Sequence, residues 1–384
     1  MTKMKKLLII TILALLALGL GACTGRRVVT SGWSGITVNE ETIYLSSGPQ
    51  VYAVALKNGT QIWQYPPEAD AKVNFYAAPV LTADGTQIII SSYNSEIHSV
   101  NPENGLKIWS FTIPSSKSGL DIWPFNLLGE SKNPVRFIAS PLVTAEGIFA
   151  PASNNTLYAL DLEGGLQWEY QTDDPLWASP IWSENCECIY QVSMDHHLYA
   201  LNAESGKLIW KSEDLGGPMV SPPAISESGL IIVSTFNNEV IALDESSHDV
   251  EWRYATNDWA WASPLIDGEQ VYVSDIGNNG DPSTLYALEL ATGDVLWQIQ
   301  PGGSIFDAPL VQDDLIYIST DTSSLVVVDQ DGVVQRNQPF EGKLYAGPIS
   351  GGDKLLLAPS EFEYYLIALN QSGIQTWGYP PADN

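Results

Sequence analysis

Few residues in this chain have the types and spacing that catalysis or metal binding would need. Cys186 and Cys188 stand two positions apart, in what we interpret as a hairpin turn. They could form a local disulfide, but a redox or metal centre would need more ligands nearby, so we interpret them as a structural or incidental pair. His196 and His197 are adjacent, and a turn or a solvated strand end fits them better than a metal site. The sequence therefore predicts no catalytic and no metal-binding residue.

Residues 1–22 have the pattern of a segment that directs secretion. Lys3, Lys5 and Lys6 form a basic start, an apolar run follows, and small residues precede Cys23. The apolar run is too short to span a bilayer. The sequence Leu20-Gly21-Ala22-Cys23 resembles the lipobox of bacterial lipoproteins, in which the cysteine becomes the lipidated first residue.

This resemblance implies a lipidated Cys23 after a signal peptide of residues 1–22, with residues 23–31 as a tether. An ordinary signal peptide with a chance cysteine is the alternative. The resemblance places the protein outside the cytoplasm as a membrane-anchored lipoprotein, on the periplasmic face of an outer membrane or at the cell surface where there is no outer membrane. By resemblance to enterobacterial lipoprotein sorting, an Asp after the lipidated cysteine would imply retention in the inner membrane. This chain has Thr24 at that position, which does not imply such retention.

Net charge restricts the class of partner. The chain has 17 Lys and Arg against 45 Asp and Glu, a net charge of −28 at pH 7, and loss of residues 1–22 would make it more negative. Nucleic acid and anionic membrane surfaces repel such a chain. We therefore expect no nucleic-acid partner, and attachment to the membrane through the lipid on Cys23 rather than through a basic patch.

The elements that must position any binding surface are repeats. Residues 285–297 consist of an apolar run, a polar turn and a second run that ends in Trp, which predicts two strands joined by a hairpin. Seven further copies occur at residues 51–63, 97–109, 157–168, 198–210, 240–252, 325–336 and 365–377. They return at intervals of roughly 40 to 46 residues, with one longer interval, as expected of four-stranded propeller blades.

Each period also contains two further strand-like segments, such as 263–266 and 270–274, so each period has four strands, A to D in chain order. This favours a propeller over a solenoid. The predicted fold is all-β, an eight-bladed β-propeller of four-stranded antiparallel blades over residues 32–380, with a tail at 381–384. Blades one and eight each contain four strands, so we expect the ring to close by side-chain packing, with Trp377 facing the first strand of blade one.

A turn Gly stands four residues before most of the repeat tryptophans and should supply a positive φ. His248 replaces that Gly before Trp252, and Arg336 replaces the Trp of the seventh copy, which predicts a weaker contact between blades seven and eight. We expect the tryptophan rings to be structural residues between adjacent sheets. They are Trp63, Trp109, Trp168, Trp210, Trp252, Trp297 and Trp377.

A small residue followed by Pro marks the start of another strand in each period. Pro belongs at a strand start or a sheet edge, where no ladder hydrogen bond is lost, and small residues suit the crowded axis. This predicts the innermost strand, A, with Trp33 at the Pro position of blade one. The pairs are Ala78-Pro79, Ser140-Pro141, Ser179-Pro180, Ser221-Pro222, Ser263-Pro264, Ala308-Pro309 and Gly347-Pro348.

The repeat resembles the pyrroloquinoline quinone (PQQ)-like β-propeller family, whose blades carry a Tyr-Ala-Leu-Asp, Thr-Gly, Trp pattern. Residues 157–161 and 198–202, the latter followed by Gly206 and Trp210, match that pattern closely. The resemblance covers roughly residues 30–380 and implies the fold more than the function, because one fold hosts many activities.

Two branches of that family imply different functions. The quinoprotein dehydrogenases carry adjacent cysteines and a calcium site; this chain has no adjacent cysteines, and we interpret its run Asp275, Asn278, Asn279 and Asp281 as an extended turn. The other branch is lipid-anchored and non-catalytic and includes a subunit of the outer-membrane β-barrel assembly machinery. It implies a cofactor-free scaffold that binds envelope proteins or peptides. A PQQ-dependent dehydrogenase, or a propeller that binds a small ligand or glycan, is the alternative.

With strands in the order A to D, the D–A and B–C connections share one face. Three residues before each strand-A Pro stand Tyr76, Ile138, Trp177, Met219, Trp261, Phe306 and Tyr345, which should circle the mouth of the central channel. Their rings either cover neighbouring blades or contact a ligand. Together with the nearby Asp173, Asp174, Asp258 and Asp307, they favour a cationic or peptide-like partner.

The longest connection, residues 115–135, joins blades two and three on that same face. It is apolar without strand or helix periodicity, and long loops in compact domains are usually functional or disordered. Either a partner contact or an intramolecular lid fits such a loop. With the rim residues Tyr76, Trp177, Trp261, Phe306 and Tyr345, its Trp123, Phe125, Leu127 and Leu128 form the predicted partner-binding set.

Overall fold

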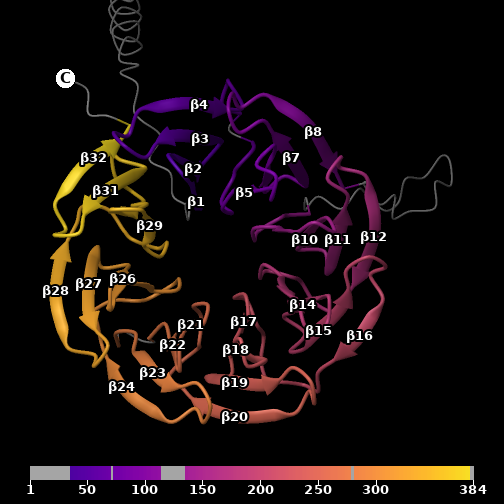
Figure 1. Ribbon diagram of the computed structural model, residues 1–384, viewed down its shortest axis with the longest axis vertical. Coiled ribbons are helices and arrows are strands. Elements are labelled where there is room, and N and C mark those ends of the chain that lie inside the picture. The colour runs from indigo at the N-terminus through magenta and orange to yellow at the C-terminus, as the bar shows by residue number, and fades with distance from the viewer. Residues whose placement is uncertain (1–34, 71, 114–134, 278–280, 381–384) are drawn as a thin grey trace, which may run out of the picture.

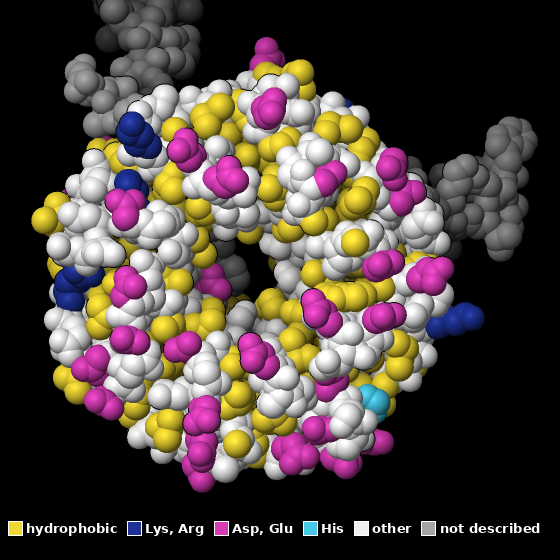
Figure 2. Space-filling model, viewed as in Figure 1, with side chains coloured by type: hydrophobic (Ala, Val, Ile, Leu, Met, Phe, Trp, Pro, Cys, Tyr) yellow, Lys and Arg dark blue, Asp and Glu magenta, His cyan; other side chains and the backbone are white. Residues whose placement is uncertain are grey.

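The computed structural model describes residues 35–70, 72–113, 135–277 and 281–380. Over these ranges the regular elements are strands, grouped into eight four-stranded antiparallel sheets that form a ring (Figure 1). Figure 2 shows the same ring as a surface with an opening at its centre. The predicted eight-bladed β-propeller is therefore confirmed.

The four strands of each blade follow one another in the chain and pair in that order. Blades one and two contain β1 (Ile36–Asn39), β2 (Thr42–Ser47), β3 (Gln50–Ala55), β4 (Gln61–Tyr65), β5 (Val80–Leu81), β6 (Ile88–Ser91), β7 (Glu96–Val100) and β8 (Lys107–Thr112). Blades three and four contain β9 (Leu142–Val143), β10 (Ile148–Ala152), β11 (Thr156–Leu160), β12 (Leu166–Gln171), β13 (Ile181–Ser183), β14 (Cys188–Val192), β15 (Leu198–Asn202) and β16 (Leu208–Lys211).

The second half of the ring repeats this order. Blades five and six contain β17 (Ala224–Ile225), β18 (Leu230–Thr235), β19 (Glu239–Asp244), β20 (Val250–Ala255), β21 (Leu265–Asp267), β22 (Gln270–Ser274), β23 (Leu285–Glu289) and β24 (Val295–Ile299). Blades seven and eight contain β25 (Leu310–Gln312), β26 (Leu315–Thr320), β27 (Ser324–Asp329), β28 (Val334–Pro339), β29 (Ile349–Gly351), β30 (Lys354–Leu357), β31 (Leu366–Asn370) and β32 (Gln375–Tyr379).

Strand A lies nearest the axis and strand D at the outer edge (Figure 1). In blades two to eight, strand A follows the predicted Pro, as β21 follows Pro264. In blade one, β1 follows Gly35, so Gly35 rather than Trp33 holds that position, and Trp33 lies outside the described residues. A Cβ on Gly35 would come within 2.1 Å of the Ala78 backbone nitrogen, which explains why a Gly and no larger residue stands directly before strand A of blade one.

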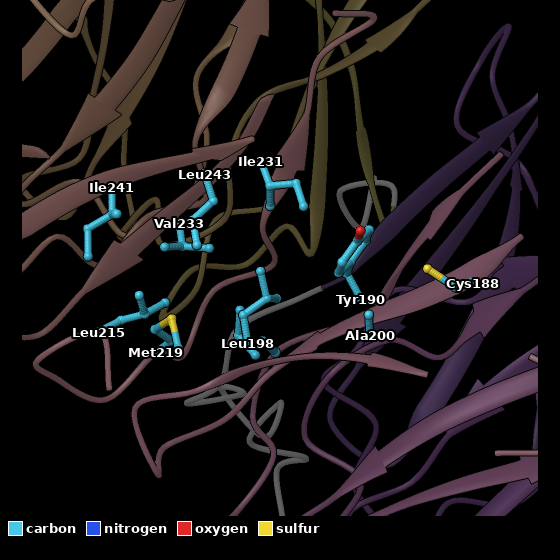
Figure 3. Packing of buried hydrophobic residues seen from close by; sticks show 12 residues of the cluster. Cys188, Tyr190, Leu198, Ala200, Leu215, Met219, Ile231, Val233, Ile241 and Leu243 are labelled. Carbon is cyan, nitrogen blue, oxygen red and sulfur yellow. The ribbon is translucent and has the colours of Figure 1, made fainter. Parts of the chain in front are cut away.

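The middle strands of each blade are buried because they are covered by a sheet on either side. Every residue of β10 and β11 is buried, whereas β12 alternates between exposed and half-buried positions at the outer edge. Each hydrophobic cluster joins two neighbouring blades. Figure 3 shows the cluster in which Tyr190 and Leu198 of blade four pack with Ile231 and Ile241 of blade five.

A tryptophan on strand D packs on the C–D turn of the next blade. The Trp252 Nε1 donates a hydrogen bond to the Leu290 carbonyl over 2.9 Å, and Gly293 of that turn has a φ of 75°. A Cβ on Gly293 would lie 2.7 Å from the Trp252 ring, so the turn needs Gly for the close approach as well as for φ. The same contact joins Trp63 to Gly105, Trp109 to Gly164, Trp168 to Gly206, Trp297 to Gly332 and Trp377 to Gly59.

The two departures from this pattern keep the contact with other side chains. His248 adopts a φ of 65°, and its ring stacks on Trp210 with centroids 4.4 Å apart. Arg336 lies against Gly373, where its Nη1 donates to the Gln371 carbonyl over 3.5 Å. The weaker contact expected between blades seven and eight stays a prediction.

The ring closes between complete blades, without strand exchange in the described residues. The Trp377 Nε1 donates to the Leu56 carbonyl over 3.2 Å, and the Tyr379 hydroxyl donates to Gln61 over 2.6 Å. Trp377 therefore meets the C–D turn of blade one, and the expectation that it faces the first strand was wrong. Strand D lies at the outer edge and strand A at the axis, so the two cannot meet across adjacent blades.

We expect Gly293→Ala to cost more stability than Gly268→Ala in the same blade. Both positions have a positive φ, which costs an L-residue about 1–2 kcal/mol. Open space surrounds Gly268, whereas the Ala at 293 would collide with Trp252, which adds about 1–3 kcal/mol of overpacking. Denaturant unfolding measures both. Equal losses would show that φ alone selects Gly in these turns.

We also expect Trp377→Ala to lower the unfolding midpoint more than Trp168→Ala. Each change removes a half-buried ring and a hydrogen bond to the next blade, and truncation of a Trp in such a contact costs up to about 3–5 kcal/mol. The D–A connection still joins blades three and four when Trp168 is lost, but no connection joins blades eight and one. Thermal unfolding compares the variants. Equal midpoints would mean that the Tyr379–Gln61 contact holds the closure as firmly as a chain connection.

Candidate functional site

The D–A connections and the B–C turns meet on one face of the ring, as predicted. Phe236, between β18 and β19, stacks on Trp259 and on Trp261, both between β20 and β21, with centroids 5.0 Å apart in each pair. Tyr93, between β6 and β7, likewise contacts Tyr76, between β4 and β5, at 5.2 Å. We call this surface the channel face.

A cavity of about 330 Å³ lies on the ring axis, because all eight blades contribute to its lining. Six of the seven residues that were expected to circle the channel line it: Tyr76, Ile138, Trp177, Trp261, Phe306 and Tyr345. The seventh, Met219, is instead buried in the cluster between blades four and five. A partner-binding role for these residues stays a prediction.

Three of these rings belong to a longer aromatic series across blades five to eight, which we call the aromatic arc: Trp259, Phe236, Trp261, Phe306 and Tyr345. Beyond the two stacked pairs of Phe236, the Trp261 and Phe306 centroids are 5.9 Å apart, and those of Phe306 and Tyr345 are 5.5 Å apart, both edge to face. Trp259 is 43% exposed, and Trp177, outside the arc, is 38% exposed.

Sequence reasoning missed Trp259 and Phe236. The spacing Trp259-Ala260-Trp261 could have identified the first, since it places two tryptophans on one side of an extended D–A connection. Phe236 belongs to a B–C turn, and the sequence alone does not show that this turn meets the connection that carries Trp259.

The four acidic residues expected near the channel have different surroundings. Asp173 and Asp174 are exposed, and Asp258 is buried and accepts a hydrogen bond from its neighbour's backbone N–H. Asp307 lines the cavity, where it accepts hydrogen bonds from the Ala308 and Gly347 backbone N–H groups over 2.8 and 2.9 Å. Protein surrounds its side chain, which raises the pKa of the carboxyl, although the side chain stays accessible from the channel.

The remaining chemistry-bearing residues have structural partners. Cys186 and Cys188 form a disulfide. The His196 Nδ1 lies 3.2 Å from Asp214, and the His197 Nδ1 lies 2.8 Å from the Ser212 carbonyl. No group of three or more His, Cys, Asp or Glu that could hold a metal ion occurs among the residues the structure describes.

The channel lining does not fit a quinone with calcium. Within the described part of the chain, Asp307 is the one charged side chain of the lining, and a polyanionic quinone there would meet a carboxylate with no Lys or Arg from these residues to pair with. Asp275 is buried away from the axis and accepts hydrogen bonds from the Thr284 N–H and the Tyr286 hydroxyl, each over 2.7 Å. Asn278 and Asn279 of the same run lie outside the described residues.

The other predicted binding residues also lie outside the described residues. They are Cys23 and, between β8 and β9, Trp123, Phe125, Leu127 and Leu128. In the ranges that the structure does describe, no helix has the length and apolar character needed to cross a membrane.

Curated proteins similar to this chain include both assembly factors and an enzyme. The chain is 22% identical over 338 residues to the outer membrane protein assembly factor BamB of Yersinia pestis, covering 80% of this chain and 77% of that protein. It is 25% identical over 177 residues to BamB of Burkholderia pseudomallei, covering 42% of each. It is 24% identical over 140 residues to a tetrathionate hydrolase of Acidithiobacillus ferrooxidans, covering 30% of this chain and 27% of that enzyme.

Solved structures share the fold at low sequence identity. The crystal structure of BamB from Moraxella catarrhalis matches with a TM-score of 0.67 at 13% identity, over 89% of this chain and 97% of that one. A quinohemoprotein alcohol dehydrogenase from Comamonas testosteroni matches with a TM-score of 0.70 at 12% identity, over 86% of this chain and 71% of that one. At such identities the likeness concerns the fold alone, and it does not separate scaffold from enzyme.

A match to a family model assigns the chain to one of these groups of proteins. The model described as outer membrane protein assembly factor BamB matches residues 21–135, 194–340 and 276–380, which together make up most of the chain. These matches cover the repeats of blades one, two and five to eight and the second half of blade four. The chain therefore belongs to the family of the outer membrane protein assembly factor BamB.

Proposed function

We propose that this protein is a non-catalytic, lipid-anchored scaffold of the cell envelope that takes part in outer-membrane protein assembly. Its membership of the BamB family is the observation that carries this proposal. The channel lining agrees with a role in binding, since its rings and single carboxylate offer no pair of groups for acid–base or nucleophilic catalysis.

The aromatic arc and the rim residues are the proposed contact surface for a protein partner. Large aromatic residues anchor many interfaces because each ring buries a large area at a small loss of conformational entropy. The exposed Trp259 stacks on Phe236, which also packs on Trp261, so the ring of Trp259 is held in place before a partner arrives. Tyr76, Trp177, Trp261, Phe306 and Tyr345 complete this surface. From the sequence, we add Trp123, Phe125, Leu127 and Leu128.

The charge distribution favours a partner that is basic or peptide-like. Acidic side chains are spread over the face of the ring that Figure 2 shows, and basic ones are few and peripheral. The chain as a whole has a net charge of −28 at pH 7, so opposite charge on a partner would speed its association with the protein. The same negative charge opposes adsorption to anionic lipid, so we propose that the lipid on Cys23 holds the protein at the periplasmic face of the outer membrane.

We expect the double substitution Trp177→Ala and Trp259→Ala to lower the amount of β-barrel proteins in the outer membrane of the organism that encodes this chain. It removes two exposed anchors from the channel face while leaving the core unchanged. The matched control is Leu106→Ala with Ile374→Ala, since these side chains are 66% and 65% exposed on C–D turns at the opposite face.

Quantitative proteomics of outer-membrane fractions, with equal variant levels checked by immunoblot, measures the effect. We expect the first pair to reproduce most of the loss seen on gene deletion and the control pair to match wild type. Unchanged β-barrel protein with the first pair, or an equal loss with both, would remove the channel face from the proposal. A variant without residues 115–135 tests the loop in the same way.

We expect Cys23→Ala to move the protein from the membrane fraction to the soluble periplasmic fraction, since lipid is the proposed attachment and no basic patch replaces it. Fractionation followed by immunoblotting measures this. Mass spectrometry of the wild-type N-terminal peptide should show a diacylated or triacylated cysteine. Full membrane retention of the variant would contradict lipid anchoring through Cys23.

A further inference from the structure

Asp307 breaks a rule that the other blades keep at the axis. In each of blades two to eight, one residue stands two positions before the strand-A Pro. It is Asp307 in blade seven and a small apolar residue in the other six blades. The six are Ala77, Ala139, Ala178, Val220, Ala262 and Ala346. Because the ring is built from equivalent blades, the apolar residues show what the architecture needs at this position. The propeller repeat therefore does not require a charged side chain at this position.

The cavity around Asp307 has the composition of a ligand site. Rings of Tyr76, Trp177, Trp261 and Phe306 line it, and among the described residues no other lining side chain is charged. Its volume of about 330 Å³ is at the lower end of the range of small-molecule pockets, about 300–1,000 Å³. One face of such a site is apolar and aromatic, and Asp307 supplies a negative charge.

Ser221 is a polar residue of the lining. It is 8% exposed, and its hydroxyl oxygen has no hydrogen-bond partner among the described residues. A buried hydroxyl without a partner costs free energy that a bound polar group would recover.

Aromatic rings on this face already bind cations of the protein itself. The Arg136 guanidinium carbon lies 4.6 Å from the Tyr93 centroid, and the Lys343 Nζ lies 5.7 Å from the Tyr345 centroid. Both distances are within the range of cation–π attraction. Lys343 is not among the lining residues, so its charge does not fill the cavity.

We propose that the axial cavity binds a compact organic cation whose alkylammonium group pairs with Asp307, packs against the rings of Trp261 and Phe306, and leaves a polar substituent to bond with Ser221. Carboxylate and ring faces together select a cation over a neutral molecule of the same shape. The free ligand could be a small molecule or a lysine side chain of a peptide. This inference does not rest on the scaffold role.

Asp307 also has a structural role that any test must separate from binding. Its two hydrogen bonds with Ala308 and Gly347 join the start of strand A in blade seven to that in blade eight. The Oδ1 atom accepts from Ala308 and the Oδ2 atom accepts from Gly347, so an Asn at this position can keep only one of the two bonds. Comparison of a cation with a neutral molecule of the same shape, both bound to the wild-type protein, separates the role of the charge from the structural role.

The pH dependence of binding has a defined sign. The surrounding protein raises the pKa of Asp307, although its side chain is exposed to the channel, so the carboxylate loses its charge as the pH is lowered through that raised value, and cation affinity should fall with it. Tyr76 and Lys343 are further titratable groups near the cavity. Burial raises the pKa of Tyr76, and a hydrogen bond to Tyr345 raises that of Lys343, whose further charged neighbours are Glu361 and Asp321.

The experiment is isothermal titration calorimetry of the full mature protein with choline and with its neutral isostere 3,3-dimethylbutan-1-ol. We expect saturable binding of choline at one site and binding of the isostere at least about tenfold weaker. Nα-acetyl-lysine amide is the third probe, and preference for it over choline would identify a peptide side chain as the source of the ammonium group. Equal binding of choline and isostere, or no binding of either cation, would overturn the proposal.

Asp307→Asn should weaken binding of the preferred cation by about tenfold or more. The matched control is Asp313→Asn, which removes the same charge from an exposed turn of the same blade at the other face, and it should bind as wild type does. Wild-type affinity in Asp307→Asn would overturn the proposal. If that variant fails to fold, the affinity of the wild-type protein for the cation is measured from neutral to acidic pH instead. A pH-independent affinity would equally contradict a role for the Asp307 charge.

Discussion

The contact between a strand-D tryptophan and a glycine of the next blade is the interaction on which this ring depends. A propeller blade cannot cover its own faces, so each sheet must be held at a fixed distance from its neighbours. The indole both fills that space and donates a hydrogen bond to a turn carbonyl, as Trp297 does to Gln330 over 2.7 Å. At the six turns that carry Gly against a Trp, a Cβ would collide with the ring. The stacked His248 shows that a flat side chain at a positive φ can also meet the ring.

This constraint explains why the sequence predicts the fold so well. The Trp and Gly recur because every blade makes the same contact, and repetition turns a weak local pattern into a strong one. The Pro before strand A was predictable for a similar reason. Blade one departs because Gly35 lies against the Ala78 backbone, and a contact between residues so far apart in the sequence leaves no local pattern.

The candidate site was less predictable. The rim positions follow from the phase of the repeat, so Tyr76 and Trp261 could be placed at the channel without a structure. Three-dimensional neighbours could not. Phe236 reaches Trp259 only because a B–C turn folds against a D–A connection. Repeats thus reveal the common architecture, and residues that depart from the repeat, such as Asp307, are where an individual function can be sought.

Because the ring closes between complete blades, the fold does not depend on which blade contains the chain termini. Each strand pairs only with its sequence neighbours inside a blade, so no blade needs a strand from the other end of the chain. A circular permutant that joins residue 380 to residue 35 through a linker as long as the other D–A connections, and opens any one of those, would keep all eight sheets. Contacts within blades are local in sequence, and only the packing of blade eight on blade one joins distant segments, as the 318-residue separation of Tyr379 and Gln61 illustrates. Such a chain can assemble blade by blade and pay the entropy of long-range closure once.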